Sequence, residues 1–136
     1  MRLAGNVIVV TGASRGIGRA VALECAAQGA TLALTARDPD ALELVADECA
    51  SLGGGAPRPR CTALDLAAID GIQRLFQDVF ADHGRLDGLV NNAGILHEGL
   101  LGMIRAEDVD RVLAVNVRAP LMAMQFAARL LARRKS

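Results

Sequence analysis

Short apolar runs alternate with longer segments of helical periodicity along this chain. Runs rich in Val, Ile, Leu and Thr are too short for helices and predict strands at residues 7–10, 31–35, about 60–64 and 86–90. Apolar residues at helical spacing predict helices at residues 16–28, about 38–52, 67–82 and about 107–134. Strands that alternate with helices of this length form right-handed βαβ units. The pattern therefore predicts an α/β fold, a Rossmann-like doubly wound parallel sheet truncated after about four strands and four helices.

Glycine and proline mark the connections between these elements. Gly29 follows the first predicted helix and Gly84 follows the third, where a left-handed residue commonly ends a helix. The glycines and prolines between residues 53 and 59 predict a flexible surface loop before the third strand. No internal repeat or linker interrupts the 136 residues, so we expect a single domain over residues 1–136.

The charges of the chain balance, with 15 Lys and Arg against 15 Asp and Glu. Such a chain has no overall field to attract nucleic acid or an anionic membrane, and we expect neither as a partner. The only lysine, Lys135, lies beside Arg133 and Arg134, and this basic cluster is typical of a solvated helix end.

Three cysteines, Cys25, Cys49 and Cys61, lack the spacing of metal ligands. We therefore expect no metal and interpret them as small buried thiols in a reducing compartment. No apolar run reaches the ~18 residues of a membrane-spanning helix. The first predicted strand begins too early to leave room for a signal peptide. These observations together predict a cytoplasmic protein.

A glycine-rich turn, Thr-Gly-Ala-Ser-Arg-Gly-Ile-Gly at residues 11–18, joins the first predicted strand to the first helix. Gly12 permits a sharp exit from the strand. Gly16 and Gly18 remove Cβ atoms that would hold a pyrophosphate away from the backbone or separate helix from sheet. The helix start offers unpaired N–H groups to an anion. The turn predicts a phosphate site, although a strand-turn-helix without a ligand is an alternative.

This turn and the segment Asn91-Asn92-Ala93-Gly94 together resemble the short-chain dehydrogenase/reductase family, particularly its 3-oxoacyl-carrier-protein reductase and carbonyl reductase group. The resemblance covers nearly the whole chain. It implies an NADP(H)- or NAD(H)-dependent oxidoreductase that reduces a carbonyl or a 3-oxoacyl thioester. It also implies a cofactor site. The end of the second predicted strand would select between the two cofactors, and the rest of the site would be made by Gly12, Ala13, Ser14, Arg15, Gly16, Ile17, Gly18, Asp65, Leu66, Asn91, Ala93 and Gly94.

The end of the second predicted strand should meet the adenosine ribose, and it reads Thr-Ala-Arg up to Arg37. An acid at this point would accept hydrogen bonds from a free 2′-hydroxyl, whereas an arginine suits a 2′-phosphate. Arg15 in the glycine turn adds a second positive charge. We therefore expect NADP(H) as the cofactor. Two alternatives remain open: Arg37 could pair with Asp38 or Asp40 on the surface, and Asp38 keeps NAD(H) possible.

Asp65 and Leu66 follow the third predicted strand. The family resemblance implies that they contact the adenine, with the carboxylate accepting a hydrogen bond from its amine. Taken from the residues alone, Asp65 is equally an N-cap for the third helix, and the two roles are compatible. The resemblance also places Asn91 nearest the cofactor.

Asn116 lies on the predicted inward stripe of the fourth helix. A buried amide without a partner would cost on the order of 1 to 3 kcal/mol, so we expect it to have one. Pro120, four residues later, has no N–H for the carbonyl of Asn116, which predicts a kink and a carbonyl available to water. The family resemblance implies that Asn116 belongs to the catalytic tetrad and holds a water in a proton relay. A locally bonded Asn with an incidental kink is the alternative.

The chain contains no tyrosine, although the family uses a tyrosine and a lysine to move the proton of the carbonyl oxygen. We therefore expect the chain to be the cofactor-binding half of such a reductase, inactive alone. An exposed sheet edge and an uncovered helix stripe predict association, and the resemblance implies a homo-oligomer through the fourth helix. The alternative is a non-catalytic nucleotide-binding module that pairs with a full-length reductase.

Overall fold

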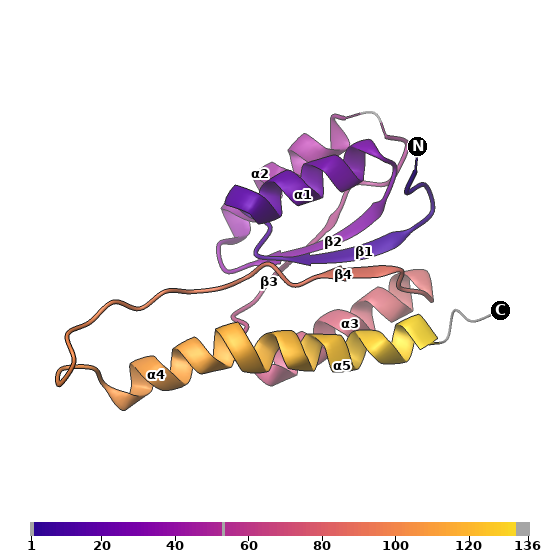
Figure 1. Ribbon diagram of the computed structural model, residues 1–136. Coiled ribbons are helices and arrows are strands. Elements are labelled where there is room, and N and C mark those ends of the chain that lie inside the picture. Colours follow the sequence, from indigo (N-terminus) through magenta and orange to yellow (C-terminus); the bar gives the residue numbers. More distant parts are fainter. Residues whose placement is uncertain (1, 53, 133–136) are drawn as a thin grey trace.

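Four parallel strands form one sheet in the described part of the chain, in the order β3-β2-β1-β4 (Figure 1). The structure is a computed structural model that describes residues 2–52 and 54–132. Its strands are β1 (Val7–Thr11), β2 (Thr31–Ala36), β3 (Arg60–Ala63) and β4 (Gly88–Val90). At the centre of the sheet, Val9 of β1 is paired with Ala33 of β2 and with Leu89 of β4. The predicted parallel α/β sheet is confirmed.

Helices cover both faces of this sheet, as Figure 1 shows. The helices are α1 (Gly16–Ala27), α2 (Pro39–Ala50), α3 (Ile69–His83), α4 (Ala106–Leu113) and α5 (Ala119–Ala132). Val7 and Val9 of β1 pack into the core beneath α3 and α5, whereas Ile8 and Val10 pack into the core beneath α1 and α2. Because β1 is buried on both faces, its sequence is a continuous apolar run instead of an alternating one.

Two helix ends carry residues that commonly cap helices. Asp38 is the N-cap of α2 and accepts hydrogen bonds from the N–H groups of Asp40 at 3.0 Å and Ala41 at 3.3 Å. Gly84 ends α3 in the left-handed conformation, with φ 67°. In the predicted loop at residues 53–59, Gly54 passes close to the end of α1, where an added Cβ would lie 2.2 Å from the carbonyl oxygen of Ala26. Gly53 lies outside the described residues.

The predicted fourth helix is interrupted by a π-helical turn at Ala114–Arg118. The N–H of Ala119 bonds to the carbonyl of Ala114, five residues back, just before Pro120. The regular hydrogen bonds of the α-helix are therefore interrupted at the point where Pro120, which has no N–H, predicts a kink. The helix is described as far as Ala132, so the basic cluster at Arg133, Arg134 and Lys135 lies outside the described residues.

The predicted inward stripe of this helix is wrong at its first half. Val109 and Leu113 are 46% and 51% exposed, and Asn116 is exposed as well. The stripe is correct in α5, where the buried residues include Ala119 and Ala123. The reason is that α4 projects beyond the carboxyl ends of the strands, where no sheet lies beneath it (Figure 1). Within the described residues, no helix is long and apolar enough to cross a bilayer.

A buried carboxylate ties the start of β1 to the segment before β4. The side chain of Asp87 is 5% exposed, and its Oδ2 accepts a hydrogen bond from the N–H of Val7 at 2.8 Å. Its two oxygens also accept from Nε and Nη2 of Arg85, at 3.0 and 2.9 Å. The backbone N–H of Asp87 in turn donates to the carbonyl of Val7 at 2.8 Å. Asp87 therefore extends the pairing with β1 by one residue, to the position just before β4 begins.

We expect Asp87→Ala to lower the free energy of unfolding by about 2 kcal/mol, because it leaves the buried N–H of Val7 and the guanidinium of Arg85 without their acceptor. Asp87→Asn is the matched control, since it keeps an oxygen acceptor for Val7, and it should lose less. Urea unfolding followed by circular dichroism measures both variants. An alanine variant as stable as the parent protein would contradict this role.

Candidate functional site

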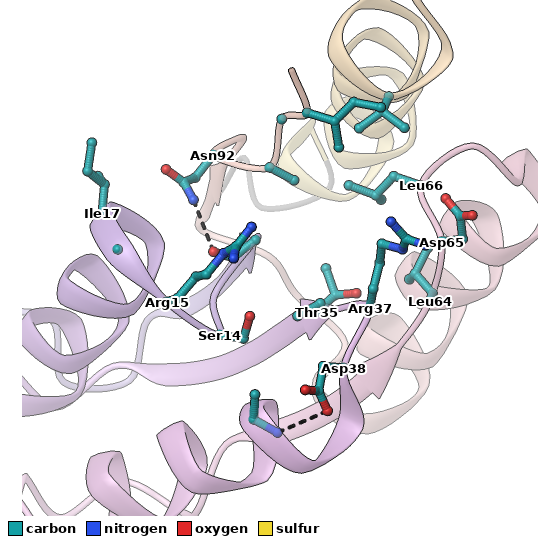
Figure 2. A pocket seen from close by; sticks show the side chains of 18 of the residues that line it. Ser14, Arg15, Ile17, Thr35, Arg37, Asp38, Leu64, Asp65, Leu66 and Asn92 are labelled. Carbon is teal, nitrogen blue, oxygen red and sulfur yellow. Dashed lines mark hydrogen bonds between the residues drawn. The ribbon is translucent and has the colours of Figure 1, made fainter. Parts of the chain in front are cut away.

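A cavity of about 700 Å³ lies at the carboxyl ends of the strands. The turns after β1, β2, β3 and β4 form its walls, and α4 closes one side of it. Figure 2 shows the side chains that line the cavity. Ligands of open α/β sheets bind at this edge, where the loops after the strands converge. Ten residues predicted from the sequence line it: Gly12, Ser14, Arg15, Gly16, Ile17, Arg37, Asp65, Leu66, Ala93 and Gly94.

The glycine turn forms one wall of this cavity. Gly12 and Gly16 have φ of 64° and 59°, in the left-handed region that favours glycine. An added Cβ at Gly16 would meet no atom within 4 Å, so the backbone there is open to a ligand. The N-cap of α1 is Arg15, whose side chain has no acceptor to offer the first N–H groups of the helix. An anion in the cavity could therefore take these donors.

Gly18 lies behind this wall and does not line the cavity. An added Cβ would lie 2.1 Å from the carbonyl oxygen of Gly12 and 2.4 Å from Nδ2 of Asn92. Gly18 therefore lets α1 start against the end of β1, which is the helix-packing role predicted for it. Ala13 is fully buried and also lies outside the cavity lining.

Thr11 and Asn92 bind the glycine turn to the loop after β4. The hydroxyl oxygen of Thr11 accepts hydrogen bonds from the N–H groups of Asn92 and Ala93, both at 3.1 Å. Nδ2 of Asn92 donates to the carbonyl of Gly12 at 3.0 Å, as drawn in Figure 2. The role of Thr11 was not predicted from the sequence, in which a threonine at the end of a strand was the signal.

Arg37 follows β2 and points along the cavity wall in Figure 2. Within residues 2–52 and 54–132 it forms no ion pair with Asp38 or Asp40, which was one of the two alternatives. Asp38 instead caps α2 through its Oδ1. Nearby, the hydroxyl of Thr35 is buried in the cavity wall and has no hydrogen-bond partner among the described residues. A polar ligand could supply that partner.

Asp65 is not the N-cap of α3, so that prediction is wrong. The helix begins at Ile69, and its N-cap is Ala68. Asp65 instead accepts a hydrogen bond from the N–H of Ala67 at 3.0 Å, which forms a local turn before the helix. Its carboxylate also pairs with Arg111 of α4, with Nη1–Oδ2 at 3.1 Å and Nη2–Oδ1 at 3.3 Å.

These contacts keep Asp65 ionised. The Ala67 N–H, the guanidinium of Arg111 and then the charge of Arg37 hold the pKa of the Asp65 carboxyl below its usual value. Arg111 was missed in the sequence because its partner is far away along the chain. A basic residue five positions before Asn116 was its only signal.

Asn116 and Asn91 lie outside the cavity lining. Both ends of the Asn116 amide bond to the backbone of Ile95, with Oδ1 accepting at 2.8 Å and Nδ2 donating at 2.7 Å. The predicted partner therefore exists, although the amide of Asn116, in the π-helical turn, is exposed instead of buried. Nδ2 of Asn91 donates to the carbonyl of Pro120 at 3.3 Å. These two amides thus fix the loop after β4 to the long helix, which consists of α4, the π-helical turn and α5.

The donor set of the cavity suits an elongated ligand with anionic groups. One wall offers helix N–H groups beside exposed glycine backbone, and two exposed arginines, Arg15 and Arg37, stand at the rim. Leu64, Leu66 and Ile95 add apolar surface for a flat ring. No group of three His, Cys, Asp or Glu side chains that could hold a metal ion occurs in the described part of the chain.

The family model described as short chain dehydrogenase matches residues 6–136. The 11-beta-hydroxysteroid dehydrogenase-like 4A of Arabidopsis thaliana is 39% identical over 90% of this chain and 41% of its own length. The 3-oxoacyl-(acyl-carrier-protein) reductase FabG of Thermotoga maritima is 35% identical over 93% of this chain and 50% of its own. The chain thus spans half or less of the length of these two curated relatives.

A solved structure of a short-chain oxidoreductase is also similar to this chain. The crystal structure of a metagenomic short-chain oxidoreductase in complex with NADP superposes with a TM-score of 0.88 and is 41% identical. The superposition covers 96% of this chain and 58% of that one.

Proposed function

The chain belongs to the short-chain dehydrogenase family, and we propose that it binds NADP(H) as the cofactor half of an oxidoreductase that reduces a carbonyl or a 3-oxoacyl thioester. The observation that carries this proposal is the cavity, in which an open helix start and an arginine without an ion pair in the described part of the chain lie along one wall. The relative that reduces 3-oxoacyl-(acyl-carrier-protein) and the neighbour bound to NADP support it.

Each part of the cofactor has candidate residues in the cavity. The turn from Gly12 to Ile17 and the N–H groups of α1 would hold the pyrophosphate. Arg37, with Arg15, would bind the 2′-phosphate, because a guanidinium forms paired hydrogen bonds with phosphate oxygens. Asp65 and Leu66 would contact the adenine. Ala93 and Gly94, supported by Asn91, would line the way to the nicotinamide.

The reduced nicotinamide supplies the hydride in such a reaction. Asn116 would contribute by fixing Ile95, and through it the loop beside the nicotinamide, and a water on its backbone carbonyl would extend the proton relay. The sequence contains no tyrosine, so the proton for the carbonyl oxygen must come from another group. We therefore propose that these 136 residues alone do not reduce a carbonyl.

A second candidate is a non-catalytic nucleotide-binding module that pairs with a full-length reductase. An apolar row on the long helix favours it: Leu113, Val117, Leu121 and Met124 are each more than half exposed. The same row supports a homo-oligomer through this helix. In both cases we propose that residues 1–136 form one NADP(H)-binding half-domain of a cytoplasmic protein.

Titration with NADPH and NADH, followed by the fluorescence of the cofactor, tests the proposed function. We expect a dissociation constant on the order of micromolar for NADPH and at least about tenfold weaker binding of NADH. A folded protein that binds neither cofactor would refute the proposal. Co-elution of this chain with a full-length relative on a sizing column would favour the pairing module over the reductase, provided that the chain alone reduces no carbonyl.

A further inference from the structure

Three arginines and two aspartates line the cavity, but only one of these arginines forms an ion pair with another described residue. Asp38 uses its carboxylate to cap α2. Asp65 forms a two-point ion pair with Arg111, at 3.1 and 3.3 Å. In the described part of the chain, neither Arg15 nor Arg37 has an ion pair within 4.0 Å. The pairing therefore leaves two guanidinium groups for a ligand.

Asp65 has two cations near it, its partner Arg111 and the side chain of Arg37. Figure 2 shows the side chain of Arg37 extending toward Asp65 along the cavity wall. The charge of Arg37 also helps, after the Ala67 N–H and Arg111, to lower the pKa of the Asp65 carboxyl, which requires the two side chains to be near each other. Arg37 is thus the next cation that the carboxylate would meet if Arg111 were absent.

We propose that Arg111 is a positioning residue for cofactor choice: by holding the carboxylate of Asp65, it leaves the guanidinium of Arg37 to the 2′-phosphate of NADP(H). The inference rests on the proposed function, since it assumes that Arg37 meets this phosphate. Without Arg111, Asp65 attracts Arg37 and brings its own negative charge toward the ribose. The loss then falls on NADPH more than on NADH, because only NADPH carries the 2′-phosphate.

Anchoring of the loop after β3 is a different role, and the chain offers a control for it. Nη2 of Arg118, in the π-helical turn, donates to the carbonyl of Ala67 at 2.7 Å. Arg111 and Arg118 therefore hold the same loop from the same long helix, but only Arg111 does so through a carboxylate. A variant of Arg118 reports the effect of loosening the loop without freeing Asp65.

The test compares dissociation constants for NADPH and NADH in the parent protein, Arg111→Met, Arg118→Met and the double variant Arg111→Met/Asp65→Asn. We expect Arg111→Met to reduce the preference for NADPH by about fivefold, the size of one exposed charge interaction. Arg118→Met should change both affinities by a similar factor. The double variant should recover the preference of the parent, because it has no carboxylate to draw Arg37 away.

Equal losses of NADPH and NADH affinity in Arg111→Met, or no recovery in the double variant, would overturn the inference while the proposed function stands. A parent protein that binds neither cofactor would overturn both. Circular dichroism checks that each variant is folded. If Arg111→Met does not fold, Asp65→Asn alone decides, since it should keep or increase the preference for NADPH, and a loss of that preference would refute the role of Asp65.

Discussion

Replacing Gly18 with alanine should lower the midpoint of thermal unfolding by about 10 °C and weaken NADPH binding at least about tenfold. The new Cβ would lie 2.1 Å from the carbonyl oxygen of Gly12 and 2.4 Å from Nδ2 of Asn92. Both neighbours are fixed, because this same carbonyl accepts the hydrogen bond of Asn92. The helix start must therefore move away from β1, and the phosphate donors move with it.

Gly71→Ala is the matched control for this change. Gly71 lies in the first turns of α3, and an added Cβ would touch only the side chain of Leu64, at 3.5 Å. Alanine favours a helix interior over glycine by roughly 0.5–1 kcal/mol, so this variant should melt at the parent temperature or above. Scanning calorimetry and NADPH titration compare the two. A Gly18→Ala variant that melts and binds NADPH like the parent protein would contradict this packing role of Gly18.

Arg37→Asp should reverse the cofactor preference, with NADPH binding weakened about 100-fold and NADH binding unchanged or improved. The variant loses a charge-assisted contact of about 1.5–3 kcal/mol and places a negative charge beside the 2′-phosphate. In NADH the same position carries a hydroxyl, from which the new carboxylate can accept a hydrogen bond. Because Arg37 has no ion pair in the described part of the chain, its loss leaves no carboxylate unpaired there.

Arg74→Asp makes the same change of charge on the exposed surface of α3, away from the cavity. It separates the local contact of Arg37 from the general effect of net charge on an anionic cofactor. Titrations of both variants with both cofactors give the comparison. A preference that Arg37→Asp leaves unchanged, or that Arg74→Asp alters equally, would remove Arg37 from the 2′-phosphate site.

The sheet could be predicted from the sequence because its two central strands, β1 and β2, are buried on both faces. β1 and β2 read as apolar runs, and the glycine turn between β1 and α1 has conformations that favour glycine. The site at the carboxyl edge follows from this order of elements. Ten of the predicted residues line one cavity for the same reason, since each lies in a loop at this edge or, like Gly16 and Ile17, in the first turn of the helix that follows.

The sequence did not predict how α4 and the following turn relate to that cavity. A periodic pattern does not show where a helix extends beyond the sheet. Leu113 and Asn116 were therefore predicted on the buried face of the helix, although both are exposed. It also carries no information on side chains that meet from distant segments. Arg111 reaches Asp65 from 46 residues away, and Arg118 reaches Ala67 from 51 residues away. Contacts of this kind depend on the final placement of the helix.

The hydrogen bonds that join Thr11, Gly12, Asn92 and Ala93 also affect the entropy of binding. They connect the turn after β1 to the loop after β4 by three contacts of 3.0 to 3.1 Å. Two loops that are tied together in this way lose little further freedom when a ligand lies across both of them. Folding has already ordered this wall of the cavity. A dinucleotide that spans it would therefore lose less conformational entropy on binding, and it would bind more tightly.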